Sequence, residues 1–234
     1  MASARSLTGP RLPAASGKAT DLVVLCHGYG ADGNDLIGLA PHWGRALPTV
    51  AFAAPNAPER CQGAPSGYQW FAISNRNAGS RNVEAPAALL NEFIDSELAR
   101  LDLPSDRFAL VGFSQGAMMS LHVGLARPSR PKAILSYSGL LAGAERFGEL
   151  TSSEVPPILL VHGDADPMIP ADMMFESAIA LGSMGARVQW HLSLGLGHSI
   201  DQTGLEMGAR FLALAFRGRL KAASPYSSRL ALAE

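Results

Sequence analysis

The sequence predicts an α/β fold in which a mostly parallel sheet is covered by helices on both faces. Three observations support this. Short apolar runs alternate with longer segments of helical periodicity along the chain. Most of the short runs are apolar nearly throughout, which is typical of strands buried on both faces. The 234 residues, 47% of them hydrophobic, suit one large domain with a substantial core.

Six apolar runs have the length and composition of strands. The first, "DLVVLCHG", leads into a glycine-rich stretch, and the others end in similar polar or glycine-containing segments. The predicted strands cover residues 21–28, 49–55, 107–113, 132–138, 157–163 and 187–195.

Five segments between and after these strands are predicted to be helical. The segment 84–101 places large apolar residues at helical spacing, and the segment 115–127 ends just before Pro128. Pro41 makes the first turn of the earliest helix uncertain. The predicted helices cover residues 35–47, 84–101, 115–127, 171–184 and 203–217.

The chain reads as a single domain, 1–234, with a core of about 7–217. Residues 56–82 have no regular pattern, and a loop of that length is usually functional or disordered. Whether this loop acts as a lid is left open. Residues 218–234 have little to contribute to a core, so we expect a mobile tail.

Charge and composition exclude several classes of function. The net charge is −1, and no run of Lys or Arg suggests nucleic-acid binding. No apolar stretch is long enough for a membrane span, and the first residues lack the apolar core of a signal peptide. Two cysteines do not make a disulfide scaffold. We therefore expect a cytoplasmic protein.

The stretch "GYGADG", 28–33, has the G-x-G-x-x-G spacing of a dinucleotide-binding loop. Such a loop is followed, about 20 residues on, by an acidic residue at the end of the next strand. Here the next strand runs "TVAFAAPNAP", and Glu59 lies well past it. The nucleotide hypothesis is rejected.

The stretch "GFSQG", 112–116, places G-x-S-x-G between a strand and a helix. A nucleophilic serine sits on such a turn, where glycines allow close backbone approach. The alternative is a plain turn whose serine caps the helix. A nucleophile also needs a base and an orienting acid, in the order Ser, Asp, His. Asp164 or Asp166 and then His198 follow Ser114 in that order, each just past a strand.

Acyl transfer also needs N–H donors for the developing oxyanion. One comes from the residue after the nucleophile, Gln115, and our candidate for the other is Tyr29 in the glycine-rich loop after the first strand. His27 and His162 precede glycines at strand ends and are predicted to brace loops. No metal-ligand spacing is present, so no metal site is expected.

The motifs "LCHGYGADGNDLIGLA", "GFSQGAMMSL", "HGDADPMIP" and "GLGHSI" together resemble the phospholipase/carboxylesterase family of α/β-hydrolases. This family includes acyl-protein thioesterases and bacterial carboxylesterases, and the likeness covers about residues 7–217. It implies an α/β-hydrolase fold and no cofactor. It also implies Asp166 as the triad acid, with Asp164 supporting it, and Tyr29 and Gln115 as the oxyanion donors.

The resemblance predicts a serine carboxylesterase acting on short- to medium-chain acyl esters. The first alternative is an acyl-protein thioesterase or lysophospholipase acting on longer chains, and a remote one is a non-catalytic binding module. Trp70 and Phe71 are predicted either to line the acyl pocket or to anchor their loop in the core. Family members are often homodimers, and the sequence is neutral on whether this chain forms one.

Overall fold

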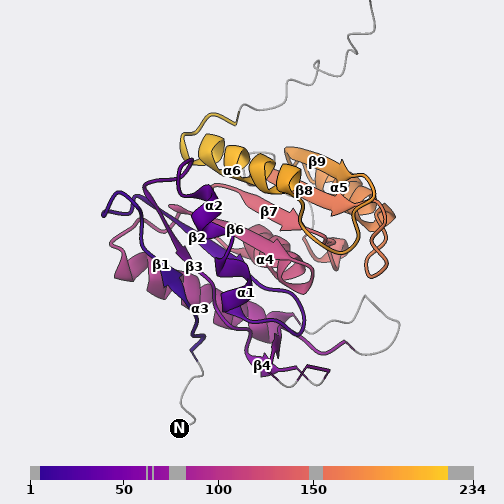
Figure 1. Ribbon diagram of the computed structural model, residues 1–234, viewed down its shortest axis with the longest axis horizontal. Coiled ribbons are helices and arrows are strands. Elements are labelled where there is room, and N and C mark those ends of the chain that lie inside the picture. The colour runs from indigo at the N-terminus through magenta and orange to yellow at the C-terminus, as the bar shows by residue number, and fades with distance from the viewer. Residues whose placement is uncertain (1–5, 62, 65, 74–82, 148–154, 221–234) are drawn as a thin grey trace, which may run out of the picture.

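The computed structural model describes residues 6–61, 63–64, 66–73, 83–147 and 155–220 (Figure 1). A seven-stranded sheet of order β1-β3-β2-β6-β7-β8-β9 runs through the middle of the molecule. Only β1 is antiparallel to its neighbour, and all other neighbours are parallel. The strands are β1 (Arg11–Leu12), β2 (Asp21–Cys26), β3 (Val50–Ala53), β6 (Phe108–Phe113), β7 (Ile134–Tyr137), β8 (Ile158–Gly163) and β9 (Val188–Ser193).

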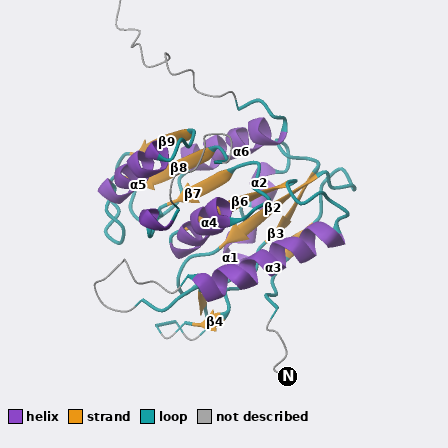
Figure 2. Ribbon diagram, turned by 180° about the vertical axis from the view of Figure 1, so that it is seen from behind, coloured by secondary structure: helices purple, strands orange, loops and turns teal. Residues whose placement is uncertain are grey.

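Helices cover both faces of this sheet (Figures 1 and 2). Alternate residues of β2 pack on opposite sides, Leu22 and Val24 against one layer and Val23 and Leu25 against the other, as the two-residue period of a strand requires. One layer holds α3 (Glu84–Arg100), α4 (Gln115–Ala126) and α5 (Asp172–Ser183). The other holds α1 (Gly33–Ile37), α2 (Ala40–Trp43) and α6 (Gln202–Phe216).

The predicted α/β fold, its six main strands and four of its five helices are therefore confirmed. The predicted helix 35–47 is wrong as one element, because the chain forms α1 and α2 instead. Asp32 caps α1, accepting the N–H of Asn34. Pro41, near the start of α2, has no N–H with which to continue a helix from α1.

The segment 56–82 contains a small hairpin that the sequence did not predict. Its strands are β4 (Glu59–Arg60) and β5 (Tyr68–Gln69), paired antiparallel. Residues 62, 65 and 74–82 of this segment and 221–234 of the predicted tail lie outside the described residues, so the mobile tail stays a prediction and the question of a lid stays open. A short 3₁₀ helix, η2 (Ala144–Arg146), was also not predicted.

None of the helices in the described ranges is long and apolar enough to cross a membrane.

A buried carboxylate ties β1 to α3. Glu97 is 1% exposed, and its two oxygens accept hydrogen bonds from Arg11 and Arg100 at 2.6–2.9 Å. Burial alone raises the pKa of Glu97, but the bonds from Arg11 and Arg100 outweigh it and hold the pKa below its ordinary value of 4.5.

Replacing Glu97 with glutamine is expected to lower the free energy of unfolding near neutral pH by about 1–3 kcal/mol. A carboxylate whose folded pKa is depressed stabilises the fold fully above its unfolded pKa and loses that contribution as pH falls through the folded value. The difference between wild type and Glu97→Gln should therefore shrink as pH falls below about 4.5. Urea unfolding over this range measures it, with exposed Glu92→Gln on the same helix as control. A pH-independent difference would contradict this account.

Candidate active site

Ser114 lies on a sharp turn between β6 and α4, at the carboxyl edge of the sheet. Its φ of 54° and ψ of −118° are outside the conformations that non-glycine residues ordinarily adopt. The Ser114 N–H donates to the carbonyl of Tyr137 on the neighbouring strand at 2.9 Å, which anchors the turn. The half-buried side chain borders a cavity. This is the turn that the G-x-S-x-G spacing predicts.

The two glycines of the motif are required by close approach of the backbone. A Cβ at Gly112 would lie 2.3 Å from the carbonyl oxygen of Gly116, and a Cβ at Gly116 would lie 1.9 Å from that of Cys26. Both distances are far below van der Waals contact, so α4 can begin this close to the sheet only without those side chains.

Asp166 follows β8 and His198 follows β9, and their side chains meet. His198 Nδ1 lies 2.7 Å from Asp166 Oδ2, and the Asp166 side chain is fully buried. The other oxygen, Oδ1, accepts the N–H groups of Met168 and Ile169 at 2.8 and 2.9 Å. Burial alone raises the pKa of Asp166, but these N–H groups and His198 together hold it below its ordinary value. An ionised Asp166 is thus held ready to orient His198.

The neighbouring acid has a different position. Asp164 is exposed, and its Oδ1 accepts the N–H of Gly195 at 2.6 Å in the loop that carries His198. Asp164 therefore braces that loop and makes no contact with the His198 ring within the described residues.

Two buried residues that the sequence analysis did not assign to this site also support it. His162 Nε2 lies 2.8 Å from the carbonyl of Ile169 and 3.3 Å from Asp166 Oδ2, consistent with a loop-bracing histidine. Ser138, at φ 46°, donates from its hydroxyl to the carbonyl of Ser199 at 3.3 Å, beside His198. No motif marks Ser138 in the sequence.

The glycine-rich loop after β2 lies on the other side of Ser114. It pairs with the hairpin segment through Gly30 N–H to Tyr68 O at 2.9 Å and Tyr68 N–H to Ala31 O at 2.8 Å. The backbone N–H groups of Tyr29 and Gln115 have no acceptor in the described part of the chain. Both residues line the cavity with Ser114, so two free donors are available beside the serine.

The Gln115 side chain fixes the wall of this cavity. Its Oε1 accepts the Trp70 N–H, and its Nε2 donates to the Phe71 carbonyl, both at 2.7 Å. Phe71 lines the cavity, whereas Trp70 is fully buried and does not. The Trp70 indole instead donates to the carbonyl of His27 at 2.9 Å. Of the two predicted pocket residues, only Phe71 reaches the pocket, and Trp70 has the anchoring position.

The cavity has a volume of about 350 Å³. It brings together four of the five predicted triad and oxyanion positions, Tyr29, Ser114, Gln115 and His198. The fifth, Asp166, does not line the cavity but contacts His198. The rest of the wall is mainly apolar and was not predicted; it includes Ile73, Phe113, Met118, Met168 and Ile169. Ser114 Oγ makes no hydrogen bond to His198 within the described residues, and such bonds often tighten only when substrate binds.

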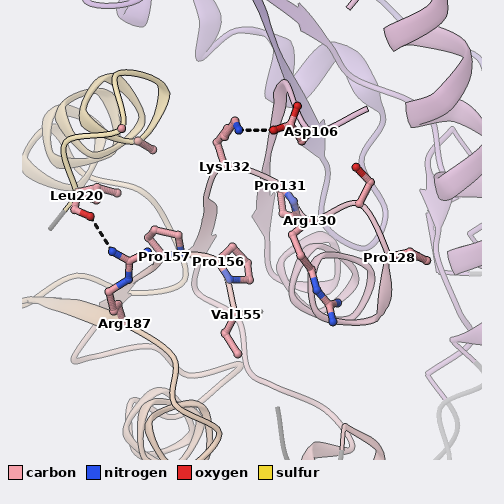
Figure 3. Close-up of a pocket in the computed structure, with 13 residues that line it drawn as sticks. Asp106, Pro128, Arg130, Pro131, Lys132, Val155, Pro156, Pro157, Arg187 and Leu220 are labelled. Carbon is pink, nitrogen blue, oxygen red and sulfur yellow. Dashed lines mark hydrogen bonds and ion pairs between the residues drawn. The ribbon is translucent and has the colours of Figure 1, made fainter. Parts of the chain in front are cut away.

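A second cavity, of about 620 Å³, lies at the opposite, amino edge of the sheet (Figure 3). Its cations already have partners: Lys132 pairs with Asp106, Arg130 donates to the Leu125 carbonyl, and Arg187 donates to the Leu220 carbonyl at 2.7 Å. Ligand sites of open α/β sheets form at the carboxyl ends of strands, so this cavity is not the candidate site. The described residues contain no cluster suited to a metal ion.

The sequence pattern of the phospholipase/carboxylesterase family matches residues 8–216. The chain belongs to this family. Acyl-protein thioesterase 1 of Schizosaccharomyces pombe is 33% identical over 168 residues, 68% of this chain and 74% of that protein. Esterase YpfH of Escherichia coli is 28% identical over 191 residues, 80% of each chain.

Among solved structures, esterase PE8 is 40% identical and superposes with a TM-score of 0.81, covering 89% of this chain and 98% of that one. This member of the phospholipase/carboxylesterase family therefore has the α/β-hydrolase fold. It is a hydrolase of the esterase and thioesterase type.

Proposed function

We propose that the protein is a serine carboxylesterase that acts on short- to medium-chain acyl esters through an acyl-enzyme intermediate. One observation carries this proposal: Ser114, His198 and the residues of two backbone N–H groups that have no acceptor among the described residues line one largely apolar cavity, and His198 contacts a buried aspartate.

In the proposed mechanism, Ser114 Oγ attacks the ester carbonyl while His198 takes its proton. Asp166 keeps the proton of the resting imidazole on Nδ1, which leaves Nε2 free to accept, and it then stabilises the imidazolium. The N–H groups of Tyr29 and Gln115 donate to the oxyanion of the tetrahedral intermediate. His198 gives its proton to the leaving alcohol, and water repeats the sequence to release the acid.

The size and lining of the cavity favour a substrate with a neutral acyl group of modest size. Its walls are side chains such as Phe71, Met118 and Ile169, which bury hydrocarbon favourably. Its described lining contains one carboxylate, the exposed Asp35, and no Lys or Arg that would pair with a negatively charged acyl chain. Partners are thus proposed to be small-molecule esters rather than nucleic acid.

The second candidate is an acyl-protein thioesterase or lysophospholipase. The relative from Schizosaccharomyces pombe supports it. Lengthening the acyl chain separates the two, because a long chain needs an apolar groove beyond the cavity.

A series of p-nitrophenyl esters from acetate through butyrate and octanoate to palmitate tests the proposal. Each buried methylene contributes about 0.8 kcal/mol, so the two methylenes added from acetate to butyrate should raise kcat/KM about 15-fold. We expect it to peak by octanoate and then fall. Ser114→Ala provides the blank. A continued steep rise to palmitate, or a preference for palmitoyl thioesters, would favour the second candidate.

The cytoplasmic location and the single domain over 1–234 stay predictions from the sequence. The sequence is neutral on whether the chain forms a homodimer.

A further inference from the structure

His27 is a buried imidazole beside the glycine-rich loop, and the mechanism above does not use it. It is 0% exposed and does not border the cavity. Its Nδ1 lies 2.7 Å from the carbonyl oxygen of Gly28, and its Nε2 lies 2.9 Å from the backbone nitrogen of Ala57.

These two contacts determine which ring nitrogen carries the proton. The N–H of Ala57 can only donate, so Nε2 must be the unprotonated acceptor. The proton is then on Nδ1, which donates to the Gly28 carbonyl. Burial lowers the pKa of His27, and the Gly28 carbonyl, Asp32 and Asp35 only partly offset this, which favours the neutral ring that the contact with the Ala57 N–H requires.

The carbonyl that His27 holds belongs to the same peptide unit as a proposed oxyanion donor. Gly28 C=O and Tyr29 N–H form one planar trans peptide, so they point in opposite directions and turn together. Gly28 has no side chain to restrain this unit, and the bond from Ala31 N–H to the same carbonyl is longer, at 3.3 Å. The direction of the Tyr29 N–H is therefore set mainly by His27.

The ring itself is held in place by its neighbours. The Trp70 indole donates to the His27 carbonyl at 2.9 Å, and the two ring centres are 5.7 Å apart. The Tyr68 ring lies in an edge-to-face arrangement with the same imidazole, with ring centres 6.5 Å apart. An imidazole packed in this way cannot turn without breaking its bonds to Gly28 and Ala57.

We propose that His27 is a positioning residue that aims the Tyr29 N–H at the oxyanion. The inference rests on the proposed function. It assigns His27 no contact with substrate and no proton transfer. Its effect should appear only where negative charge develops on the carbonyl oxygen, so it should change kcat and leave KM nearly unchanged.

The test compares His27→Leu with His27→Asn. Leucine fills the space without a donor, whereas the asparagine amide can still donate to the Gly28 carbonyl. For p-nitrophenyl butyrate we expect His27→Leu to lower kcat about 10- to 100-fold with KM within about threefold. Inhibition by an alkyl trifluoromethyl ketone, whose adduct with Ser114 carries an oxyanion, should weaken by the same factor. His27→Asn should retain most of both.

Trp43→Phe serves as the matched control. It also removes a buried bond from a ring N–H to a backbone carbonyl, here from the Trp43 indole to Leu205 at 3.0 Å, and Trp43 does not line the cavity. Both substitutions should lower the unfolding temperature, but only His27→Leu should weaken inhibition by the trifluoromethyl ketone. Equal loss in His27→Leu and His27→Asn, or a loss of kcat without weaker ketone inhibition, would overturn the proposal.

Two measurements on wild type complete the test. Nitrogen-15 NMR of the His27 ring should show a protonated Nδ1 and a bare Nε2; the opposite tautomer would overturn the inference even if the variants fail to fold. Labelling of Ser114 by a fluorophosphonate reports on the proposed function alone. Failure to label would refute that function. Labelling, combined with unchanged kcat and unchanged ketone inhibition in His27→Leu, would refute only the role of His27.

Discussion

Replacing Ser114 with alanine is expected to lower turnover of p-nitrophenyl butyrate by about 10⁴- to 10⁶-fold. The variant keeps the cavity and both free N–H groups but has no oxygen to form the acyl-enzyme. Because the remaining members of a triad act only through the nucleophile, adding His198→Ala to Ser114→Ala should cost little more.

The control for this experiment is a thermal-unfolding measurement, which shows whether the variant is folded. Ser114→Ala should unfold at a temperature similar to that of wild type, since the substitution removes one half-buried hydroxyl that makes no hydrogen bond in the described part of the chain. Activity that survives in a folded Ser114→Ala protein would show that the triad assignment is wrong.

Replacing Asp166 with asparagine is expected to lower kcat about 10⁴-fold, and the contacts show why. Oδ1 of Asp166 accepts the N–H groups of Met168 and Ile169, so the asparagine oxygen must take that position. Its NH₂ group then faces His198 Nδ1 and donates to it. The histidine proton moves to Nε2, where it blocks acceptance of the proton of Ser114.

Asp164→Asn is the matched comparison, two residues away. An asparagine oxygen can still accept the N–H of Gly195, so we expect a loss of less than about tenfold. Measuring kcat/KM for both variants decides which acid orients His198. An Asp164→Asn variant more damaged than Asp166→Asn would reverse the assignment.

Most of the main strands were predictable because they are nearly continuous apolar runs; β9, with the sequence VQWHLS, is the more polar and more exposed exception. β2 and β6 are buried on both faces, and that environment dictates their composition directly. The strands β1, β4 and β5 were not predictable, because a strand of two residues is too short to show an alternation of apolar and polar side chains. β1 exists because Arg11 and Leu12 meet Ala53 and Phe52 of β3, a pairing set by tertiary structure.

The placement of the candidate site residues was predictable from order and position. Ser114, Asp166 and His198 each follow a strand, and parallel strands bring their carboxyl ends to one edge. The cavity wall was not predictable, because Met168 and Ile73 lie in loops, whose sequences show no regular alternation of apolar and polar residues. Trp70 and Phe71 are adjacent in sequence, and tertiary contacts determine that one faces the core and the other the cavity: Gln115 holds the backbone of both, and the Trp70 indole donates to the His27 carbonyl.

The conformation of Ser114 has a consequence for how such a protein can evolve. A serine at φ 54° costs the fold roughly 1–3 kcal/mol, part of which a glycine at the same position would recover. Under the proposed mechanism, that glycine would remove the nucleophile. Stability and turnover would then place opposite demands on this one position.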